Sequence, residues 1–167
     1  QDRVRDYYSY LWTRQRGVSA SSILDDIPRS LSQEILMFLN REVVNRVEIF
    51  RGADELFIRE SVQLLKPRVF LPAEYIIRQG EYGDCMYFLT SGEVRIVIDG
   101  VEVARLGQGS PFGETALVEN LHRNASVVSE GYCTGYQLNK EDFDKLRSKY
   151  PDFDRQVREV VEARKQR

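Results

Sequence analysis

The chain has 167 residues, a formal net charge of −2 and 42% apolar residues. This length is enough to bury a hydrophobic core without help from a disulfide or a metal. No uninterrupted apolar stretch reaches about 18 residues, so we expect no segment that spans a membrane. The slightly negative charge argues against a nucleic-acid-binding surface. One histidine and two cysteines argue against a protein-built metal site, and we expect Cys85 and Cys133 to be buried, reduced thiols.

Charge and glycine are unevenly distributed along the chain. Residues 67–139 carry 5 basic and 9 acidic side chains, whereas residues 1–66 carry 10 of each. Nine of the 11 glycines lie between Gly80 and Gly135. Because glycine favours turns, this distribution predicts helices, then a turn-rich β region, then helices again. An anion bound in the acidic middle section would need a shaped local site rather than a diffuse positive field.

The first section predicts three helices. Apolar residues recur at helical spacing over residues 4–12 and 31–39. These two helices have no sheet of their own to cover, so they must pack on each other, on the β region or on another chain. The third helix follows Asp54, a suitable N-cap, and should end at Pro67. Its apolar face consists of Ile58, Val62 and Leu65.

The middle section has a period of two. Alternating apolar runs over residues 94–98 and 101–103 are separated by Asp99-Gly100. This dipeptide predicts a hairpin, because a type I′ turn needs a positive φ at both central residues. Another alternating run covers residues 132–138. Short strands at this spacing predict a small antiparallel barrel or roll.

The last section predicts two more helices. Asn139 can cap the first, and Pro151 can open the second. One further step along the apolar face of the second helix is Arg164. A charged group at this position usually extends into solvent, but it could also reach something bound beneath the helix. That face consists of Phe153, Val157, Val160 and Val161.

The segment of residues 111–126 carries the features that suggest chemistry. Gly113 permits a turn, and residues 114–117 can form one helical turn whose free backbone N–H groups suit a phosphate. Arg123 could hold two phosphate oxygens through charge-assisted hydrogen bonds. Glu114 would repel a phosphate and suits a hydroxyl pair such as that of a ribose. Taken alone, these residues are also compatible with an ordinary turn and a solvated arginine.

Longer motifs favour the interpretation of this segment as a binding site over an ordinary turn. Phe112-Gly113-Glu114, Ala116-Leu117 and Arg123-Asn124-Ala125-Ser126 resemble the phosphate-binding cassette of cyclic-nucleotide-binding domains. Tyr75-Ile-Ile-Arg-Gln-Gly80, Met86-Tyr-Phe and Ser91-Gly92 precede this cassette in the order that the family shows. Upstream, Tyr10-Leu-Trp-Thr13 and Ile27-Pro28 resemble the C-linker of cyclic-nucleotide-gated and hyperpolarisation-activated channels. The resemblance covers essentially the whole chain, and a prokaryotic potassium channel is one candidate.

The resemblance implies an α+β fold in two parts. These are a helical C-linker over residues 1–52 and a cyclic-nucleotide-binding domain over residues 53–167. The domain would contain an antiparallel, jelly-roll-like β-roll over about residues 68–138 and C-terminal helices over residues 140–167. The implied protein is a non-enzymatic sensor on the cytoplasmic side of the cell membrane, part of a cation channel that is tetrameric through its C-linker. Its C-terminal helix would close over the ligand and act on the pore through the C-linker, and no cofactor is implied besides the ligand, cAMP or cGMP.

The resemblance also implies individual roles. Glu114 would accept the ribose 2′-OH, Arg123 would neutralise the cyclic phosphate, and Arg164 would cover the base. Family members that prefer cGMP often have threonine directly after the phosphate-binding arginine, and Asn124 at this position favours cAMP. The remaining implied cAMP-binding residues lie in the cassette or in the wall under the purine: Gly113, Thr115, Ala116, Ala125, Ile96, Ala104 and Leu106.

Two other classes of protein share parts of this pattern. A soluble cAMP receptor, such as a transcription factor or a kinase regulatory subunit, would need a helix-turn-helix or a second cassette with an inhibitor segment, and we find neither in this sequence. An enzyme would need a nucleophile with its base, a second acid or a metal cluster. A lone carboxylate and arginine supply none of these, so we expect no catalytic activity.

Overall fold

The computed structural model describes residues 28–31, 34, 41, 45–119 and 121–166. The chain divides into two compact units, residues 1–41 and 42–167. The helices expected over residues 4–12 and 31–39 lie almost entirely outside the described residues. The second unit contains the β region and the helices next to it.

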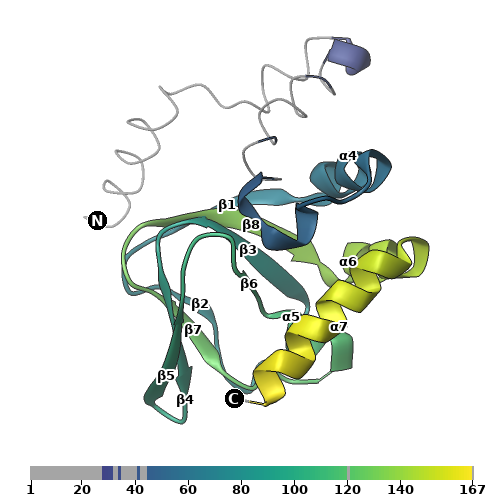
Figure 1. Cartoon of the computed structure of the whole chain (residues 1–167). Coiled ribbons are helices and arrows are strands. Elements are labelled where there is room, and N and C mark those ends of the chain that lie inside the picture. The colour runs from purple at the N-terminus through teal and green to yellow at the C-terminus, as the bar shows by residue number, and fades with distance from the viewer. Residues whose placement is uncertain (1–27, 32–33, 35–40, 42–44, 120, 167) are drawn as a thin grey trace. The chain divides into compact units, whose positions relative to one another are not determined.

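Two four-stranded antiparallel sheets form a roll (Figure 1). The first sheet has the strand order β1-β8-β3-β6 and the second has the order β2-β7-β4-β5. The predicted α+β fold with an antiparallel β-roll is confirmed. The strands are β1 Lys66–Phe70, β2 Tyr75–Ile77, β3 Cys85–Ser91, β4 Val94–Ile98, β5 Val101–Leu106, β6 Pro111–Phe112, β7 Ser126–Ser129 and β8 Cys133–Asn139.

Helices lie before, within and after the roll. Asp54 and Asn139 occupy the predicted N-cap positions, although neither side chain makes a capping hydrogen bond, and Pro151 opens the last helix as expected. Among the helices of the described residues, none has the length and apolarity to cross a membrane. The elements are the 3-10 turn η1 Glu48–Phe50 and the helices α4 Glu55–Leu64, α5 Glu114–Glu119, α6 Lys140–Lys149 and α7 Pro151–Lys165.

The end of α4 differs from the prediction. The helix ends at Leu64, and Pro67 does not terminate it but lies inside β1. β1 is at the edge of the first sheet, where a residue without a backbone N–H is tolerated. Lys66, the residue before the proline, is extended as that position requires.

The middle strand β3 is buried on both faces, because the first sheet lies between the helices and the second sheet. Met86 and Phe88 pack with apolar residues of η1, α4, α6 and α7. Cys85 and Tyr87 pack inside the roll. Successive side chains of a strand point to opposite faces, which explains this division. The prediction that Cys85 and Cys133 are buried free thiols is confirmed.

The residues before α4 contribute to the same core. Val47, Ile49 and Phe50 are buried in the cluster that contains Met86 and Phe88. The ring of Phe50 lies 5.6 Å from that of Phe88. The domain boundary expected between residues 52 and 53 stays a prediction.

The β4–β5 hairpin has the predicted turn. Asp99 has a φ of 51° and Gly100 a φ of 81°, which is the double positive φ of a type I′ turn. Ile98 and Val101 are paired across the two turn residues. The hairpin therefore follows directly from the Asp-Gly dipeptide.

Candidate functional site

A cavity of about 420 Å³ lies between the second sheet, the residues around α5 and the end of α7. Its lining comes from segments that are far apart in the sequence. Glu114 is the one predicted site residue outside this lining, and its carboxylate contacts Arg164 instead. The other ten predicted site residues all line the cavity: Ile96, Ala104, Leu106, Gly113, Thr115, Ala116, Arg123, Asn124, Ala125 and Arg164.

Five apolar lining residues were absent from the prediction. They are Ile77, Ile98, Val103, Phe112 and Val127. Ile98 could have been found from the period of two, because it follows Ile96 on the same strand face. Ile77, Phe112 and Val127 belong to the buried cluster inside the roll, which the sequence alone does not locate.

Val103 reaches the cavity because β5 contains a bulge. Ile96 pairs with Ala104, but the next residue, Val97, pairs with Glu102. Val103 is therefore the extra residue on β5. A bulge turns a side chain away from the regular alternation, so Val103 and its neighbour Ala104 both line the cavity.

Arg123 brings a buried positive charge to the cavity. The residue is 7% exposed. Its Nη1 donates to the Gly113 carbonyl at 2.8 Å, and its Nη2 donates to the Cys85 carbonyl at 2.5 Å. Its ion-pair partner among the described residues is the exposed Asp84, whose Oδ1 lies 3.7 Å from Nη2. Two carbonyls orient the guanidinium without neutralising it, and a buried charge of this kind favours a bound anion.

Main-chain bonds fix the backbone of Arg123. Its N–H donates to the Glu81 carbonyl at 2.7 Å, and its own carbonyl accepts from the Gly80 N–H at 2.8 Å. The loop between β2 and β3 thus pairs with the residues that follow α5. This pairing places the guanidinium before any ligand is bound, which reduces the entropy cost of binding.

Gly113 allows the guanidinium to lie this close to the cassette backbone. Its φ is 86°, which side chains disfavour. A Cβ atom here would lie 2.9 Å from Nη1 of Arg123 and 2.9 Å from Cδ1 of Ile77. Any larger residue would push the arginine or the cavity wall aside, so the chemistry of the site requires glycine at this position.

Glu114 and Arg164 form an ion pair at the edge of the cavity. Arg164 Nη1 donates to Glu114 Oε1 at 2.5 Å, and Arg164 Nη2 donates to the Pro111 carbonyl at 2.5 Å. Glu114 is 1% exposed, and its Oε2 has no hydrogen-bond partner among the described residues. A buried carboxylate oxygen without a donor is costly, which makes it a candidate acceptor for a ligand hydroxyl.

A second basic residue joins α7 to α5. Lys165 forms ion pairs with Glu119 of α5 and, at 3.3 Å, with Glu162 of its own helix. With the Arg164 contacts, these pairs hold the end of α7 beside the cassette. Arg164 continues the apolar face of α7, as predicted, and its side chain lines the cavity.

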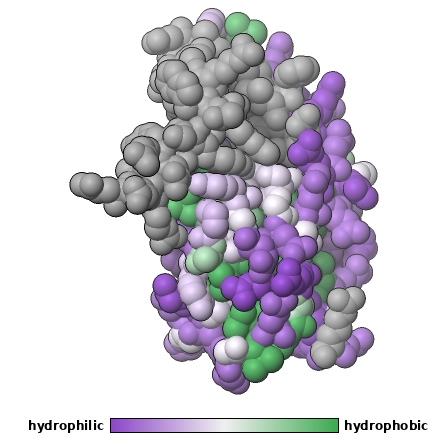
Figure 2. Space-filling view, turned by 90° about the vertical axis from the view of Figure 1, so that its left-hand side faces the viewer, coloured by the Kyte–Doolittle hydropathy of each residue, from purple (hydrophilic) through white to green (hydrophobic). Residues whose placement is uncertain are grey.

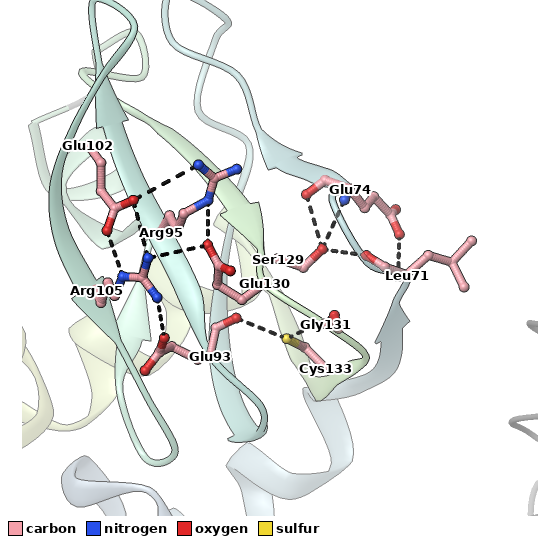
Figure 3. A network of polar contacts seen from close by, with 10 residues as sticks. All are labelled: Leu71, Glu74, Glu93, Arg95, Glu102, Arg105, Ser129, Glu130, Gly131 and Cys133. Atoms are coloured by element: carbon pink, nitrogen blue, oxygen red, sulfur yellow. Dashed lines mark hydrogen bonds and ion pairs between the residues drawn. The ribbon is translucent and has the colours of Figure 1, made fainter.

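The outer face of the second sheet is charged instead of apolar (Figure 3). Arg105 contacts Glu102 at 2.6 Å and Glu93 at 2.9 Å, and Arg95 contacts Glu130 at 2.6 Å. Hydrogen bonds from Arg105 to Glu102 and Glu93 raise the pKa of its guanidinium. Arg95 and Arg105 are thus both paired with carboxylates. Arg123, on the cavity side, donates its hydrogen bonds mainly to carbonyls.

The described residues offer little for covalent or metal chemistry. No group of three or more metal-ligating side chains occurs among them. Burial raises the pKa of the Cys85 thiol, which lies beside Arg123, and it raises the pKa of the Tyr87 hydroxyl to which the thiol donates. A thiol that stays protonated is a poor nucleophile. The arrangement suits binding of a small anion with an apolar part.

Comparisons with known proteins agree with this geometry. The chain is 34% identical over 151 residues to the potassium/sodium hyperpolarization-activated cyclic nucleotide-gated channel 4 of Oryctolagus cuniculus, an alignment that covers 90% of this chain and 13% of the relative. It is 31% identical over 161 residues to the cyclic nucleotide-gated channel beta-3 of Canis lupus familiaris, covering 93% of this chain and 21% of the relative.

The chain thus spans between about an eighth and a fifth of the length of these two relatives. The sequence model of the cyclic nucleotide-binding domain matches residues 67–150, which include seven of the eight strands of the roll in full, the whole of α5 and the predicted phosphate-binding segment. The chain belongs to the cyclic nucleotide-binding domain family.

Proposed function

We propose that the cavity binds cAMP in preference to cGMP and that the chain is the ligand-sensing part of a cyclic-nucleotide-regulated cation channel. The observation that carries the binding proposal is the buried Arg123 guanidinium, held by two carbonyls at the wall of an otherwise largely apolar cavity. One fixed positive charge opposite an apolar wall matches a molecule with one anionic end and one flat base.

The phosphate end of the ligand would lie against Arg123. The guanidinium has five N–H donors, and its bonds to the Gly113 and Cys85 carbonyls leave others for phosphate oxygens. The backbone around Gly113 and Ala116 offers further donors, because the first N–H groups of a helical turn have no partner in the turn. Each charge-assisted bond contributes about 1.5–3 kcal/mol.

The ribose would contact Glu114. Its Oε1 bonds to Arg164, and its Oε2 has no partner among the described residues. A ribose 2′-OH could donate to this free oxygen while Arg164 keeps the other. Glu114 would then link the ligand to α7 through a single carboxylate.

The base would lie along the inner face of the second sheet. Ile96, Ala104 and Leu106 supply this wall, and Arg164 lies on the opposite side at the end of α7. Asn124 lines the cavity where cGMP-preferring family members often have threonine. The lack of that hydroxyl supports a preference for cAMP.

Several features of the named relatives support a role in gating. Both are channels named for cyclic nucleotides, and their alignments cover at least 90% of this chain. Closure of α7 would act through residues 1–52, which would join four identical subunits on the cytoplasmic side of the membrane. A ligand can shift such an equilibrium only by its difference in affinity for the two states, typically about 1–3 kcal/mol. The alternative is a soluble cAMP receptor, which would have the same binding site but would not be part of a channel.

Calorimetry with cAMP tests the binding proposal. Arg123→Ala should weaken cAMP binding at least about tenfold, because it removes charge-assisted bonds worth about 1.5–3 kcal/mol. Arg68→Ala is a matched control, since Arg68 is an exposed β-strand arginine that bonds to Gln137. Its affinity should equal that of the unchanged chain. Equal affinities for all three proteins would contradict the phosphate assignment.

Electrical recording tests the channel proposal separately. The full-length protein that contains this chain should conduct cations, and cAMP should change its open probability. Arg123→Ala should shift the cAMP response to higher concentrations. A full-length protein that binds cAMP but carries no current would favour the soluble receptor.

A further inference from the structure

The far end of the β4–β5 hairpin extends beyond the strand that supports its base. β4 pairs with β7 from Val94 to Val97, and the pairing ends where Val97 lies opposite Ser126. Among the described strands, β5 is at the edge of the sheet and pairs with β4 alone. The described pairings therefore include no third strand beside residues 98–101.

This projecting part of the hairpin forms one side of the cavity. Ile98 and Val103 both line it, yet they are 36% and 54% exposed. Figure 2 shows apolar surface gathered at the lower end of this face, where the hairpin lies in Figure 1. A wall that is exposed and supported by one strand needs another contact to keep a fixed position.

Gln79 supplies that contact. Its Nε2 donates to Asp99 Oδ1 at 3.0 Å, and its Oε1 accepts from the Asp99 N–H at 2.9 Å. The amide thus holds the turn residue with one donor and one acceptor at the same time. Asp99 has a positive φ, and this pair of bonds fixes both its backbone and its side chain.

The backbone of Gln79 is tied to the phosphate side of the cavity. Its N–H donates to Ser126 Oγ at 2.9 Å, and the next residue, Gly80, donates to the carbonyl of Arg123 at 2.8 Å. Gln79 therefore lies between two parts of the site. Its main chain follows the segment that holds Arg123, and its side chain holds the hairpin turn.

We infer that Gln79 is a positioning residue that sets the distance between the base-binding wall and the phosphate-binding arginine. The inference rests on the proposed function, because it assigns the two sides of the cavity to the base and the phosphate. Loss of the side chain should release the hairpin turn while the roll, whose core lies elsewhere, stays folded. Affinity should then fall for the part of the ligand that contacts the wall and not for the phosphate.

Two ligands separate these effects: cAMP, and the cyclic ribose phosphate that lacks a base. Gln79→Ala should weaken cAMP binding about three- to tenfold, the equivalent of about 0.7–1.4 kcal/mol for two exposed hydrogen bonds. It should change binding of the base-free ligand less than about twofold. Gln63→Ala, which removes an exposed glutamine of α4, is the control and should change neither affinity. Equal losses for both ligands, or no loss for either, would overturn the inference.

A ligand-free measurement keeps this test separate from the proposed function. Amide hydrogen exchange at residues 98–103 should become faster in Gln79→Ala, and exchange in β3 should stay unchanged. Asp99→Asn retains the acceptor oxygen and should behave like the unchanged chain, whereas Asp99→Gly should accelerate exchange. If the unchanged chain binds no cyclic nucleotide, the proposed function fails while the exchange result still decides whether Gln79 holds the turn. Uniform unfolding of Gln79→Ala, or unchanged exchange at residues 98–103, would refute the role.

Discussion

The two sheets of the roll differ in what covers them. The first sheet is buried on both sides, by the helices and by the inside of the roll, and all but the last residue of its strand β3 are buried. The second sheet has the cavity on one face and exposed ion pairs on the other (Figure 3). Its strand β5 contains no fully buried residue.

Because of this difference, we expect the first sheet to contribute mainly to the stability of the domain and the second sheet mainly to ligand binding. Close packing around β3 leaves no room for a ligand, so the centre of the first sheet serves as the support of the domain, and its edge strand β6 contributes Phe112 to the cavity. The second sheet leaves apolar side chains such as Ile96 and Val103 available on its inner face. A ligand that covers these side chains would remove their apolar surface from water, which favours binding. Mutations in the two sheets should therefore change different measurements.

The largest effect should follow from a change in the first sheet. Phe88 is fully buried and lies within the cluster between the sheet and the helices. Phe88→Ala should lower the free energy of unfolding by about 3–5 kcal/mol, because it removes a large apolar side chain and leaves a void. Urea denaturation measures this loss. Val101→Ala, at a site 63% exposed, should cost less than about 0.5 kcal/mol, and similar losses for the two variants would contradict the division.

A smaller effect should follow from separating Arg164 and Glu114. Arg164→Ala removes the ion-pair partner of the buried Glu114 carboxylate, at a cost of about 1–3 kcal/mol, because the arginine is partly exposed. Adding Glu114→Gln should restore part of this stability by removing the charge. Denaturation of the single and double variants tests the coupling. Strictly additive losses would show that the two side chains act independently.

The same arginine should influence the choice of base. Arg164 lines the cavity on the side opposite the second sheet. Arg164→Ala should reduce cAMP affinity less than Arg123→Ala and should change the ratio of cAMP to cGMP affinity. Competition binding with the two nucleotides measures this ratio, and an unchanged ratio would remove Arg164 from the base-binding group.

Local sequence signals predicted most of the elements. Asp99-Gly100 specified its turn, because few dipeptides accept two positive φ values. Pro151 marked the start of α7, because proline suits the first position of a helix. The cassette motif located Arg123, which does line the cavity. These features depend on residues close together in the chain.

Contacts between distant residues could not be predicted in this way. Arg164 and Glu114 are 50 positions apart, and their ion pair depends on how α7 packs on the roll. Val103 lines the cavity because of a bulge, and a strict period of two places it on the same face as Val101 instead. Gln79 contacts Asp99 beyond the end of β7, the strand that separates β2 from β4, so this contact depends on the strand order. In each case, the missing information was sheet register or helix packing.

Acid should act on the helical layer that covers the first sheet. Hydrogen bonds from Arg158 and Arg147 lower the pKa of Asp154 in α7. Because this pKa is lower in the folded chain than in the unfolded chain, the stabilisation is fully present above the ordinary value of about 3.9. It is lost as the pH falls through the lower, folded value. Asp154→Asn should therefore flatten the acid limb of a plot of unfolding free energy against pH, with a loss of about 1 kcal/mol at neutral pH. An unchanged acid limb would mean that other carboxyl groups set the acid sensitivity.

The smallest effect should come from the charged face of the second sheet. Arg105 contacts Glu93 and Glu102, but its side chain is 50% exposed, so water and salt screen these pairs. Arg105→Ala should lower the free energy of unfolding only slightly, and added salt should reduce that difference further. Its cAMP affinity should be unchanged, because the guanidinium lies on the face away from the cavity. Gln79→Ala should show the reverse pattern, with little loss of stability and a measurable loss of affinity. If Arg105→Ala instead weakens cAMP binding as much as Gln79→Ala does, the base of the hairpin positions the wall, and the two faces of the second sheet are not independent.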